Sequence, residues 1–336
     1  MQRVQLGASG PTVSELCLGT GGYGTSIVAE QAWSIMDRFL ELGGTFLDTA
    51  HVYGAWEPGR GGASERVIGD WLCERGCRRD VVLGTKGGHP ALTEMEISRL
   101  RPGDIATDLH ESLERLRSDD IDIYWLHRDD PSIPVGEIVD ALNEHLAAGL
   151  VHSIGCSNWT TDRLAAANRW AASNGKVGFC ASQIGYSLAR ANTGSGGYAG
   201  MLYVDEETHA SHRRTEIPVV AYSSQAGGFF SGKYAADDDP ASVRNRGVVL
   251  NYYSAENFQR LERAQELAAV HGRTANEVNL AYLRSQPFQV VPIVGSRSAA
   301  QVEASCAACG WRLTEETCRW LESGDGSAGG GDEALS

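Results

Sequence analysis

The feature of this sequence that most constrains its fold is a repeated alternation of short apolar runs with longer segments of helical periodicity. Such an alternation predicts parallel strands joined by helices, and near-continuous apolar strands are typical of a sheet covered on both faces. The expected strands lie near Leu16–Gly19, Thr45–Asp48, Val81–Thr85, Ile121–Leu126, His152–Gly155, Gly178–Gln183, Val219–Tyr222 and Val290–Val294. Eight strand–helix units over about 300 residues predict an α/β fold of the (β/α)8 TIM barrel type.

Helix signals stand between these strands. Asp104 is expected to cap one helix, and Thr274 with Glu277 forms the sequence pattern of a capping box. Alanine-rich segments at 161–173 and 260–270 predict two further helices, because alanine has the highest intrinsic helix propensity. The helices are therefore expected in the order that a barrel requires.

The two ends of the chain differ from this pattern. Residues 4–13, VQLGASGPTV, predict a small β-hairpin around a glycine-containing turn, placed as a plug at one end of the barrel. The barrel is expected to form a single domain over residues 1–322. The last segment, 323–336, is rich in glycine, serine and acidic residues, so we expect a disordered tail there.

The charge of the chain excludes several classes of partner. Its net charge at pH 7 is −14, which disfavours nucleic acid and anionic membranes. There is no apolar run of about 18 residues, and the first residues lack the apolar core of a signal peptide. We therefore expect a cytoplasmic protein that acts on a small molecule; the oligomeric state is left open.

The cysteines allow one metal-site hypothesis. Without a signal peptide, most of the eight cysteines are expected to be reduced thiols. Two pairs, Cys73 with Cys77 and Cys306 with Cys309, have spacings close to those of zinc ligands. Because the pairs are far apart in the sequence, simple buried or surface thiols are the preferred interpretation.

Four polar residues lie at or just past the ends of three predicted strands: Asp48, Tyr53, Lys86 and His127. In a parallel barrel the carboxyl ends of the strands form one face, so these side chains are expected to converge. A phenol has a reference pKa of about 10, which a nearby ammonium lowers. Together they predict an acid that protonates a carbonyl, in which Tyr53 donates the proton, Lys86 lowers its pKa, Asp48 holds Lys86 and His127 orients the oxygen.

These motifs resemble the aldo-keto reductase family. LDTAHVYG at 47–54, TKGG at 85–88 and LHRDD at 126–130 are similar, in order, to the motifs of the family's catalytic tetrad. Four further segments resemble its cofactor site: GCSNW at 155–159, SQIGYS at 182–187, AYSSQAGGFFSGKY at 221–234 and PIVGSRSAAQVEAS at 292–305. The resemblance covers roughly residues 1–310 and implies a nicotinamide cofactor.

The expected cofactor contacts follow from the resemblance and from the chemistry of each group. Tyr222 offers an aromatic face to the nicotinamide ring, and Ser157, Asn158 and Gln183 suit its carboxamide. A helix start near Ala299 suits a phosphate. The full set is Gly21, Gly22, Ser157, Asn158, Gln183, Tyr222, Ser223, Gln225, Gly227, Gly295, Ser296, Arg297 and Gln301.

The resemblance implies NADP(H) in preference to NAD(H). Arg297 is the candidate for the 2′-phosphate, since a guanidinium binds phosphate well. The sequence departs from the family at Gln301, where an arginine is frequent, and at Ala304 and Ser305, where Glu-Asn is frequent. These departures leave NADH use open.

A second possible dinucleotide motif lies near the start of the chain. GTGGYG places Gly19, Gly21 and Gly24 as G-x-G-x-x-G after a strand, which is the fingerprint of a Rossmann fold. However, the following residues delay the helix, and Asp48 lies too far on to serve as the acid of that motif. The barrel interpretation is therefore preferred, with Gly21 and Gly22 allowing close approach of the first loop to the cofactor.

The predicted function is a carbonyl reductase, or alcohol dehydrogenase, that needs no metal. Candidate substrate residues are Trp56, His89, Arg128, Asp129 and Trp159, a set that suits a sugar- or polyol-like carbonyl compound. One alternative is a cofactor-binding redox sensor on the same barrel with slow turnover, like channel-associated β-subunits related to the family. Another is a metal-dependent hydrolase or isomerase with His51, His89 and His127 as ligands, although no H-x-H pair ends the first strand.

Overall fold

The computed structural model of the protein describes residues 1–192 and 200–327. Eight parallel strands close into a barrel in the order β10-β3-β4-β5-β6-β7-β8-β9, so the predicted TIM barrel is confirmed. These strands are β3 (Cys17–Gly19), β4 (Phe46–Asp48), β5 (Val82–Gly87), β6 (Ile121–Leu126), β7 (Val151–Ser157), β8 (Ser182–Gln183), β9 (Val219–Ala221) and β10 (Val290–Gly295).

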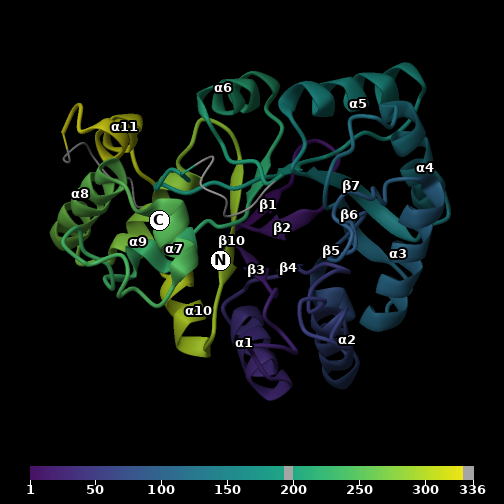
Figure 1. Ribbon diagram of the computed structural model, residues 1–336, viewed down its shortest axis with the longest axis horizontal. Coiled ribbons are helices and arrows are strands. Elements are labelled where there is room, and N and C mark those ends of the chain that lie inside the picture. Colours follow the sequence, from purple (N-terminus) through teal and green to yellow (C-terminus); the bar gives the residue numbers. More distant parts are fainter. Residues whose placement is uncertain (193–199, 328–336) are drawn as a thin grey trace.

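Helices surround the barrel, with α1 to α5 along one side and α7 to α11 along the other (Figure 1). The α-helices are α1 (Ala29–Glu41), α2 (Ala63–Arg75), α3 (Pro102–Leu116), α4 (Val135–Ala147), α5 (Thr161–Ser173), α6 (Glu206–Thr215), α7 (Arg246–Tyr252), α8 (Ala255–His271), α9 (Ala275–Arg284), α10 (Ala299–Cys306) and α11 (Glu315–Ser323). Two 3-10 turns, η1 (Arg78–Asp80) and η2 (Ala226–Ser231), complete the elements.

The helix starts follow local chemistry, with one correction. The capping box of α9 is present, because Thr274 and Glu277 bond reciprocally across the helix start. Asp104 is not a cap: α3 begins two residues earlier, at Pro102, whose fixed backbone angle suits a first helical position. Asp104 lies in the first turn instead and pairs with Arg99 at 3.4 Å.

The predicted N-terminal hairpin is present. Its strands β1 (Arg3–Gln5) and β2 (Thr12–Ser14) pair antiparallel. Leu6 and Val13 are fully buried among barrel residues such as Phe46 and Trp125. The hairpin therefore closes the end of the barrel at which the strands begin.

Strand β8 is shorter than expected. The sequence predicted residues 178–183, but the regular strand covers only Ser182–Gln183, although Cys180 and Ala181 still form backbone hydrogen bonds with β7. The side chain of Asn168 takes both backbone groups of Phe179, accepting from its N–H at 2.8 Å and donating to its C=O at 3.1 Å. A side-chain amide thus replaces the strand's hydrogen bonds at Phe179.

The strand register brings the carboxyl ends to one face. Asp48 is level with Gly19 and Gly84, and Lys86 is level with Trp125. At the other end of the chain Ser323 belongs to α11, while residues 328–336 of the expected tail lie outside the described residues. The single domain over residues 1–322 stays a prediction.

Candidate active site

Lys86 is the centre of the group that the sequence predicted. Its Nζ donates to Asp48 Oδ2 at 2.6 Å, to the carbonyl oxygen of Thr49 at 2.7 Å and to the Tyr53 hydroxyl at 3.3 Å. The Lys86 and Asp48 side chains are 1% and 3% exposed. A buried ammonium with three oxygen acceptors is fully satisfied. Strands β4 and β5 therefore bring three of the four predicted residues into direct contact.

His127 follows β6 and faces the same group. Its ring lies edge-on to Tyr53, with 5.9 Å between the ring centroids, and 4.9 Å from the ring of His89. Its backbone N–H donates to the carbonyl of Gly87 at 2.8 Å, which fixes the loop. Its Nδ1 atom is buried without a hydrogen-bond partner. The predicted tetrad thus converges on one site at the carboxyl ends of the strands.

Burial and charge act in opposite directions on these groups. Burial raises the pKa of the Tyr53 hydroxyl above its ordinary value, and the Lys86 ammonium acts against this rise without cancelling it. The sequence predicted a net lowering, so the sign is corrected: desolvation outweighs the charge. Burial also lowers the pKa of Lys86, but Asp48 and Tyr53 raise it above its ordinary value. Lys86 is therefore firmly charged and Tyr53 firmly protonated at neutral pH.

For His127, burial and every neighbouring charge lower the pKa. Burial, followed by the charge of Lys86, holds the pKa of His127 well below its ordinary value. The imidazole is therefore neutral at neutral pH. A neutral ring has one N–H donor, which is what an oxygen acceptor requires.

A carboxylate network that the sequence analysis missed supports the loops of the site. Glu65 on α2 and Asp108 on α3 are fully buried. Glu65 accepts from Thr85 Oγ1 at 2.7 Å and pairs with Arg115 at 3.3 Å. Asp108 accepts from the backbone N–H of Gly88 at 2.8 Å. The signal in the sequence is an acidic residue on the apolar face of each helix, a position that buried carboxylates hold only with partners.

The four residues expected around the nicotinamide form one hydrogen-bonded group. Asn158 has a left-handed backbone, with φ of 61°, and its Nδ2 lies 3.1 Å from Ser157 Oγ. The Tyr222 hydroxyl lies 2.8 Å from Asn158 Oδ1. Gln183 donates from Nε2 to Asp48 Oδ1 at 2.9 Å. The amide cluster is thereby tied directly to the Lys86–Asp48 pair.

The remaining cofactor candidates line a large cleft beside this group. It has a volume of about 1680 Å³ and lies among the loops after β3, β9 and β10. Its lining includes nine predicted residues, namely Gly21, Gly22, Ser223, Gln225, Gly227, Gly295, Ser296, Arg297 and Gln301. A Cβ added at Gly21 would lie 3.7 Å from the ring of Tyr53, so the cleft reaches the phenol.

The cleft carries more positive charge than the sequence indicated. Lys233 and Arg244 line it together with Arg297, against one carboxylate, Asp238. Lys233 lies in the segment 221–234 that resembles the family's cofactor site but was not singled out, and Arg244 lies beyond that segment. The Ser296 hydroxyl is buried without a partner. These cations and this free hydroxyl fit the diphosphate of a dinucleotide.

Two expected phosphate donors are engaged within the protein. The backbone N–H of Gly295 donates to Gln225 Oε1 at 3.0 Å, and that of Arg297 donates to Gln301 Oε1 at 2.7 Å. Arg297 itself is exposed. The glutamine side chains therefore occupy the positions that the sequence assigned to a phosphate, while the guanidinium remains accessible.

The predicted substrate residues form two sets: those that lie beside the tetrad, and an engaged set whose polar groups are already hydrogen-bonded within the protein. Trp56 is 50% exposed, with its ring centroid 6.2 Å from that of Tyr53, and His89 lies beside His127. Trp159 is 2% exposed and donates from Nε1 to the carbonyl of Arg128 at 3.1 Å. Arg128 donates to the Gly200 carbonyl at 3.0 Å.

Asp129 also belongs to the engaged set. Both of its oxygens lie 3.1 Å from Nε of Arg163 on α5. This carboxylate is therefore committed to an ion pair inside the protein and does not pair with its neighbour Arg128. Sequence reasoning missed the partner because α5 lies more than thirty residues away along the chain.

Other features bear on the alternatives. Within residues 1–192 and 200–327, no three His, Cys, Asp or Glu side chains gather as metal ligands would. The eight cysteines are free thiols. Over the same residues, no helix combines the length and the apolar character that crossing a membrane requires.

Comparison with known proteins agrees with this geometry. The model of the aldo/keto reductase family matches residues 15–324. The uncharacterized oxidoreductase YrpG of Bacillus subtilis (strain 168) is 30% identical over 96% of this chain and 95% of its own length. The aldo-keto reductase yakc [NADP(+)] of Schizosaccharomyces pombe is 28% identical over 92% and 86%. The aryl-alcohol dehydrogenase GME11368 of Pestalotiopsis microspora is 27% identical over 93% and 79%.

The barrel and the family match thus support an oxidoreductase of the carbonyl–alcohol type. The chain belongs to the aldo/keto reductase family.

Proposed function

We propose that the protein interconverts an aldehyde or ketone and its alcohol with NAD(P)(H), and that Tyr53 is its general acid and base. The observation that carries this proposal is the position of Lys86 Nζ, within hydrogen-bond distance of both Asp48 and the Tyr53 hydroxyl. A phenol held by a buried ammonium is stabilised when it loses its proton. It is therefore a suitable donor to a carbonyl oxygen.

Each residue of the tetrad has its own role in this reaction. Tyr53 donates its hydroxyl proton to the substrate oxygen as that oxygen gains negative charge, and the Lys86 ammonium stabilises the phenolate left behind. Neutral His127 donates a hydrogen bond to the same oxygen from Nε2, the ring nitrogen other than the buried Nδ1. Asp48 keeps Lys86 in place. A bound reduced nicotinamide supplies the hydride.

The cofactor residues support NADP(H) as the preferred form. Ser157, Asn158 and Gln183 would hold the carboxamide, and Tyr222 would face the ring. The 2′-phosphate would meet the cations of the cleft, with Arg297 as the main partner because its side chain is exposed to that cleft. The relative from Schizosaccharomyces pombe carries NADP(+) in its name, which agrees with this preference.

The state of the polar groups favours aromatic substrates over sugars. Asp129 and Trp159 are engaged within the protein, so fewer groups remain for substrate hydroxyls. Trp56, in the loop after β4, offers an exposed aromatic surface 6.2 Å from the Tyr53 ring. One relative is named an aryl-alcohol dehydrogenase. We therefore place aryl aldehydes and ketones ahead of the sugar- or polyol-like compounds that the sequence alone indicated.

The test is a steady-state assay of NADPH and NADH oxidation with benzaldehydes, aryl ketones, aldoses and oxidised polyols. Saturable turnover with at least one carbonyl, lost in Tyr53→Phe while that variant still binds NADPH, is the expected result. If Tyr53→Phe kept the wild-type kcat, Tyr53 would not be the general acid. Slow turnover on every compound, with NADPH retained through purification, would favour the redox sensor.

A second variant tests the cofactor preference. Arg297→Leu is expected to raise KM for NADPH by roughly tenfold or more while leaving KM for NADH nearly unchanged, because only NADPH carries the 2′-phosphate. Arg169→Leu, an exposed arginine on α5, is the matched control. Equal effects of Arg297→Leu on both cofactors would assign this residue to the shared diphosphate.

A further inference from the structure

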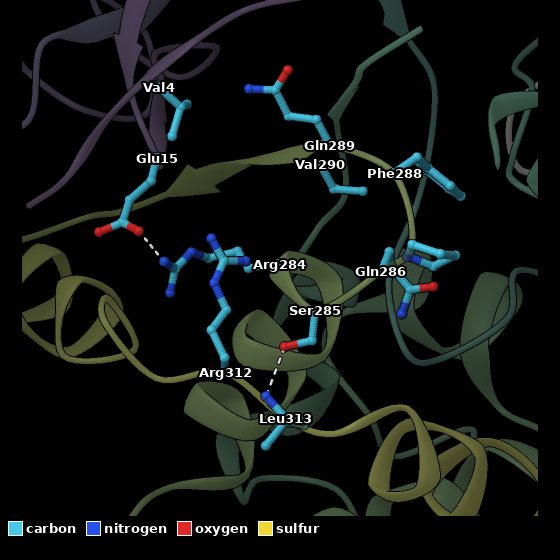
Figure 2. Close-up of a pocket in the computed structure, with 11 residues that line it drawn as sticks. Val4, Glu15, Arg284, Ser285, Gln286, Phe288, Gln289, Val290, Arg312 and Leu313 are labelled. Atoms are coloured by element: carbon cyan, nitrogen blue, oxygen red, sulfur yellow. Dashed lines mark hydrogen bonds and ion pairs between the residues drawn. The ribbon is translucent and has the colours of Figure 1, made fainter. Parts of the chain in front are cut away.

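The molecule has a second pocket, at the end of the barrel where the strands begin. It has a volume of about 470 Å³ and lies beside the start of β10, below the N-terminal hairpin. Figure 2 shows its lining, in which Glu15, Arg284 and Arg312 approach one another. The tetrad lies at the opposite ends of the strands, so this pocket is separate from the active site.

The charges in this pocket do not balance. Glu15 and Arg284 form a buried ion pair. Arg312 is half-buried, and no described residue accepts a hydrogen bond from its guanidinium or pairs with it. No other lining residue is charged, so two guanidinium groups face one carboxylate. A cation held in partial burial beside a second cation lacks the partner that such groups normally have.

The same imbalance affects Arg284. Burial, with the charge of Arg312, lowers the pKa of Arg284 to about 10. Its Nη1 donates to the carbonyl of Ala308 at 2.8 Å, but its Nε is buried without a partner. The Arg312 side chain rises beside this guanidinium in Figure 2. The two cations therefore repel each other, and one donor remains unused.

The other polar side chains of the lining are already engaged. Ser285 Oγ donates to the Ala281 carbonyl at 2.8 Å and accepts from the N–H of Leu313 at 2.8 Å. Gln289 is held by the hairpin, since its Nε2 donates to the Gln5 carbonyl at 2.9 Å.

Gln286 completes this set, because its Nε2 donates to the Tyr282 carbonyl at 3.0 Å. The polar groups left over in the pocket are therefore the guanidinium donors. The rest of the wall is apolar, from Val4, Phe288, Val290 and Leu313.

We infer that this pocket binds a small organic anion, with its carboxylate or phosphate on Arg312 and its apolar body against Phe288 and Val290. A planar guanidinium forms two parallel hydrogen bonds with either anion. The volume falls within the range of small-molecule sites. An anion there neutralises the unpaired charge that the fold leaves beside the Glu15–Arg284 pair.

The first test is isothermal titration calorimetry with 3-phenylpropionate, phenyl phosphate and the neutral 3-phenylpropanamide. Both anions are expected to bind in a saturable manner, and the amide at least about tenfold more weakly. Tighter binding of one anion identifies which head group the pocket prefers. Equal affinity for the amide, or no saturable binding of either anion, would overturn the inference.

Variants then locate the site. Arg312→Met is expected to weaken binding of both anions at least about tenfold, whereas Arg319→Met, an exposed arginine on α11, leaves it unchanged. Arg312→Glu places a carboxylate beside Arg284 and should abolish binding while the melting temperature does not fall. Both changes at position 312 remove repulsion, so both are expected to fold. Wild-type affinity in the glutamate variant would contradict the proposal.

A last control separates the two ends of the barrel, because an anion can also meet the cations of the cleft at the carboxyl end, among them Arg297. Arg297→Leu should bind 3-phenylpropionate as the wild type does. If affinity falls in Arg297→Leu and is kept in Arg312→Met, the anion sits in that cleft and the inference is wrong.

Discussion

The two ends of the barrel each bury a carboxylate–cation pair, and the pairs are built alike. At the carboxyl end, Asp48 takes Lys86 on one oxygen and the Gln183 amide on the other. At the amino end, Glu15 takes Arg284 on one oxygen and the backbone N–H of Gln2, at 3.0 Å, on the other. In both, the cation also donates to a backbone carbonyl. The difference lies in the third group beside each cation.

That third group decides what each end can do. Beside Lys86 it is the Tyr53 phenol, which is neutral and gains stability from the cation when it loses a proton. Beside Arg284 it is Arg312, a second cation that no described residue neutralises. A buried ion pair alone is a weak stabilising device, because desolvation offsets most of its attraction. Under the functions proposed above, the neighbouring group suits one pair to acid–base chemistry and the other to binding an anion.

Lys86→Met is expected to have the largest effect, because it removes the cation at the catalytic end. Asp48 would remain buried without its charged partner, which costs about 3–5 kcal/mol of unfolding free energy. The phenolate would also lose its stabilisation, so kcat should fall about 10²–10⁴-fold. Urea denaturation and NADPH oxidation measure the two losses. If stability fell and kcat did not, Lys86 would be structural only.

Glu15→Gln makes the matching change at the amino end. It leaves Arg284 and Arg312 without a carboxylate, and we expect a loss of about 3 kcal/mol in unfolding free energy with kcat unchanged. Glu303→Gln, which breaks a surface pair with Arg38 at 2.6 Å, should lower the unfolding free energy far less than Glu15→Gln does, because solvent screens the pair. A loss of turnover in Glu15→Gln would show that the two ends are coupled.

The comparison also marks what could be predicted from the sequence. The end that carries Asp48, Tyr53, Lys86 and His127 was predictable because these residues lie at or just past the ends of three apolar strands, and a parallel barrel brings strand ends together. The pair at the other end was not predictable: Glu15 and Arg284 are 269 positions apart, and neither lies at the carboxyl end of a barrel strand. Contacts of that separation depend on the closed register, which no local pattern encodes.

The helices show the same limit. The apolar stripe of α3 revealed that helix, whereas α6, with the sequence EETHASHRRT, carries no stripe for periodicity to detect. Its remaining signal was Asp205, whose side chain accepts from the N–H of Thr208 at 2.8 Å and caps the helix. A helix held by its cap and by tertiary contacts is invisible to a search for hydrophobic period.

His127 gives a pH-dependent way to sharpen the comparison. Because burial and Lys86 depress its pKa, the folded protein resists protonation at His127 and the unfolded chain does not. The contribution of His127 to the free energy of unfolding is complete above the pKa of its imidazole in the unfolded chain, about 6.5. It is lost as the pH falls from that value through the pKa of the folded state, by at most about 1.4 kcal/mol per pH unit.

His127→Gln should therefore flatten the decline of unfolding free energy below pH 6.5 by up to this slope, measured by urea denaturation between pH 5 and pH 8. Above about pH 7 the curves of the variant and the wild type should run parallel, which is the internal control. An unchanged slope below pH 6.5 would show that the imidazole takes up a proton in the folded state, contrary to its position between Lys86 and His89.

The smallest expected effects come from removing the third group at each end, and they have opposite signs. Tyr53→Phe takes one of three acceptors from Lys86, so unfolding free energy should fall by about 1 kcal/mol. Arg312→Leu removes a cation beside Arg284, so unfolding free energy should rise, by less than about 1 kcal/mol because solvent screens the half-buried guanidinium. Urea denaturation at pH 7 without added anions measures both. If Arg312→Leu instead lowered the unfolding free energy as much as Tyr53→Phe does, favourable contacts would hold Arg312 in place. The charges at the amino end would then be as well balanced as those at the carboxyl end.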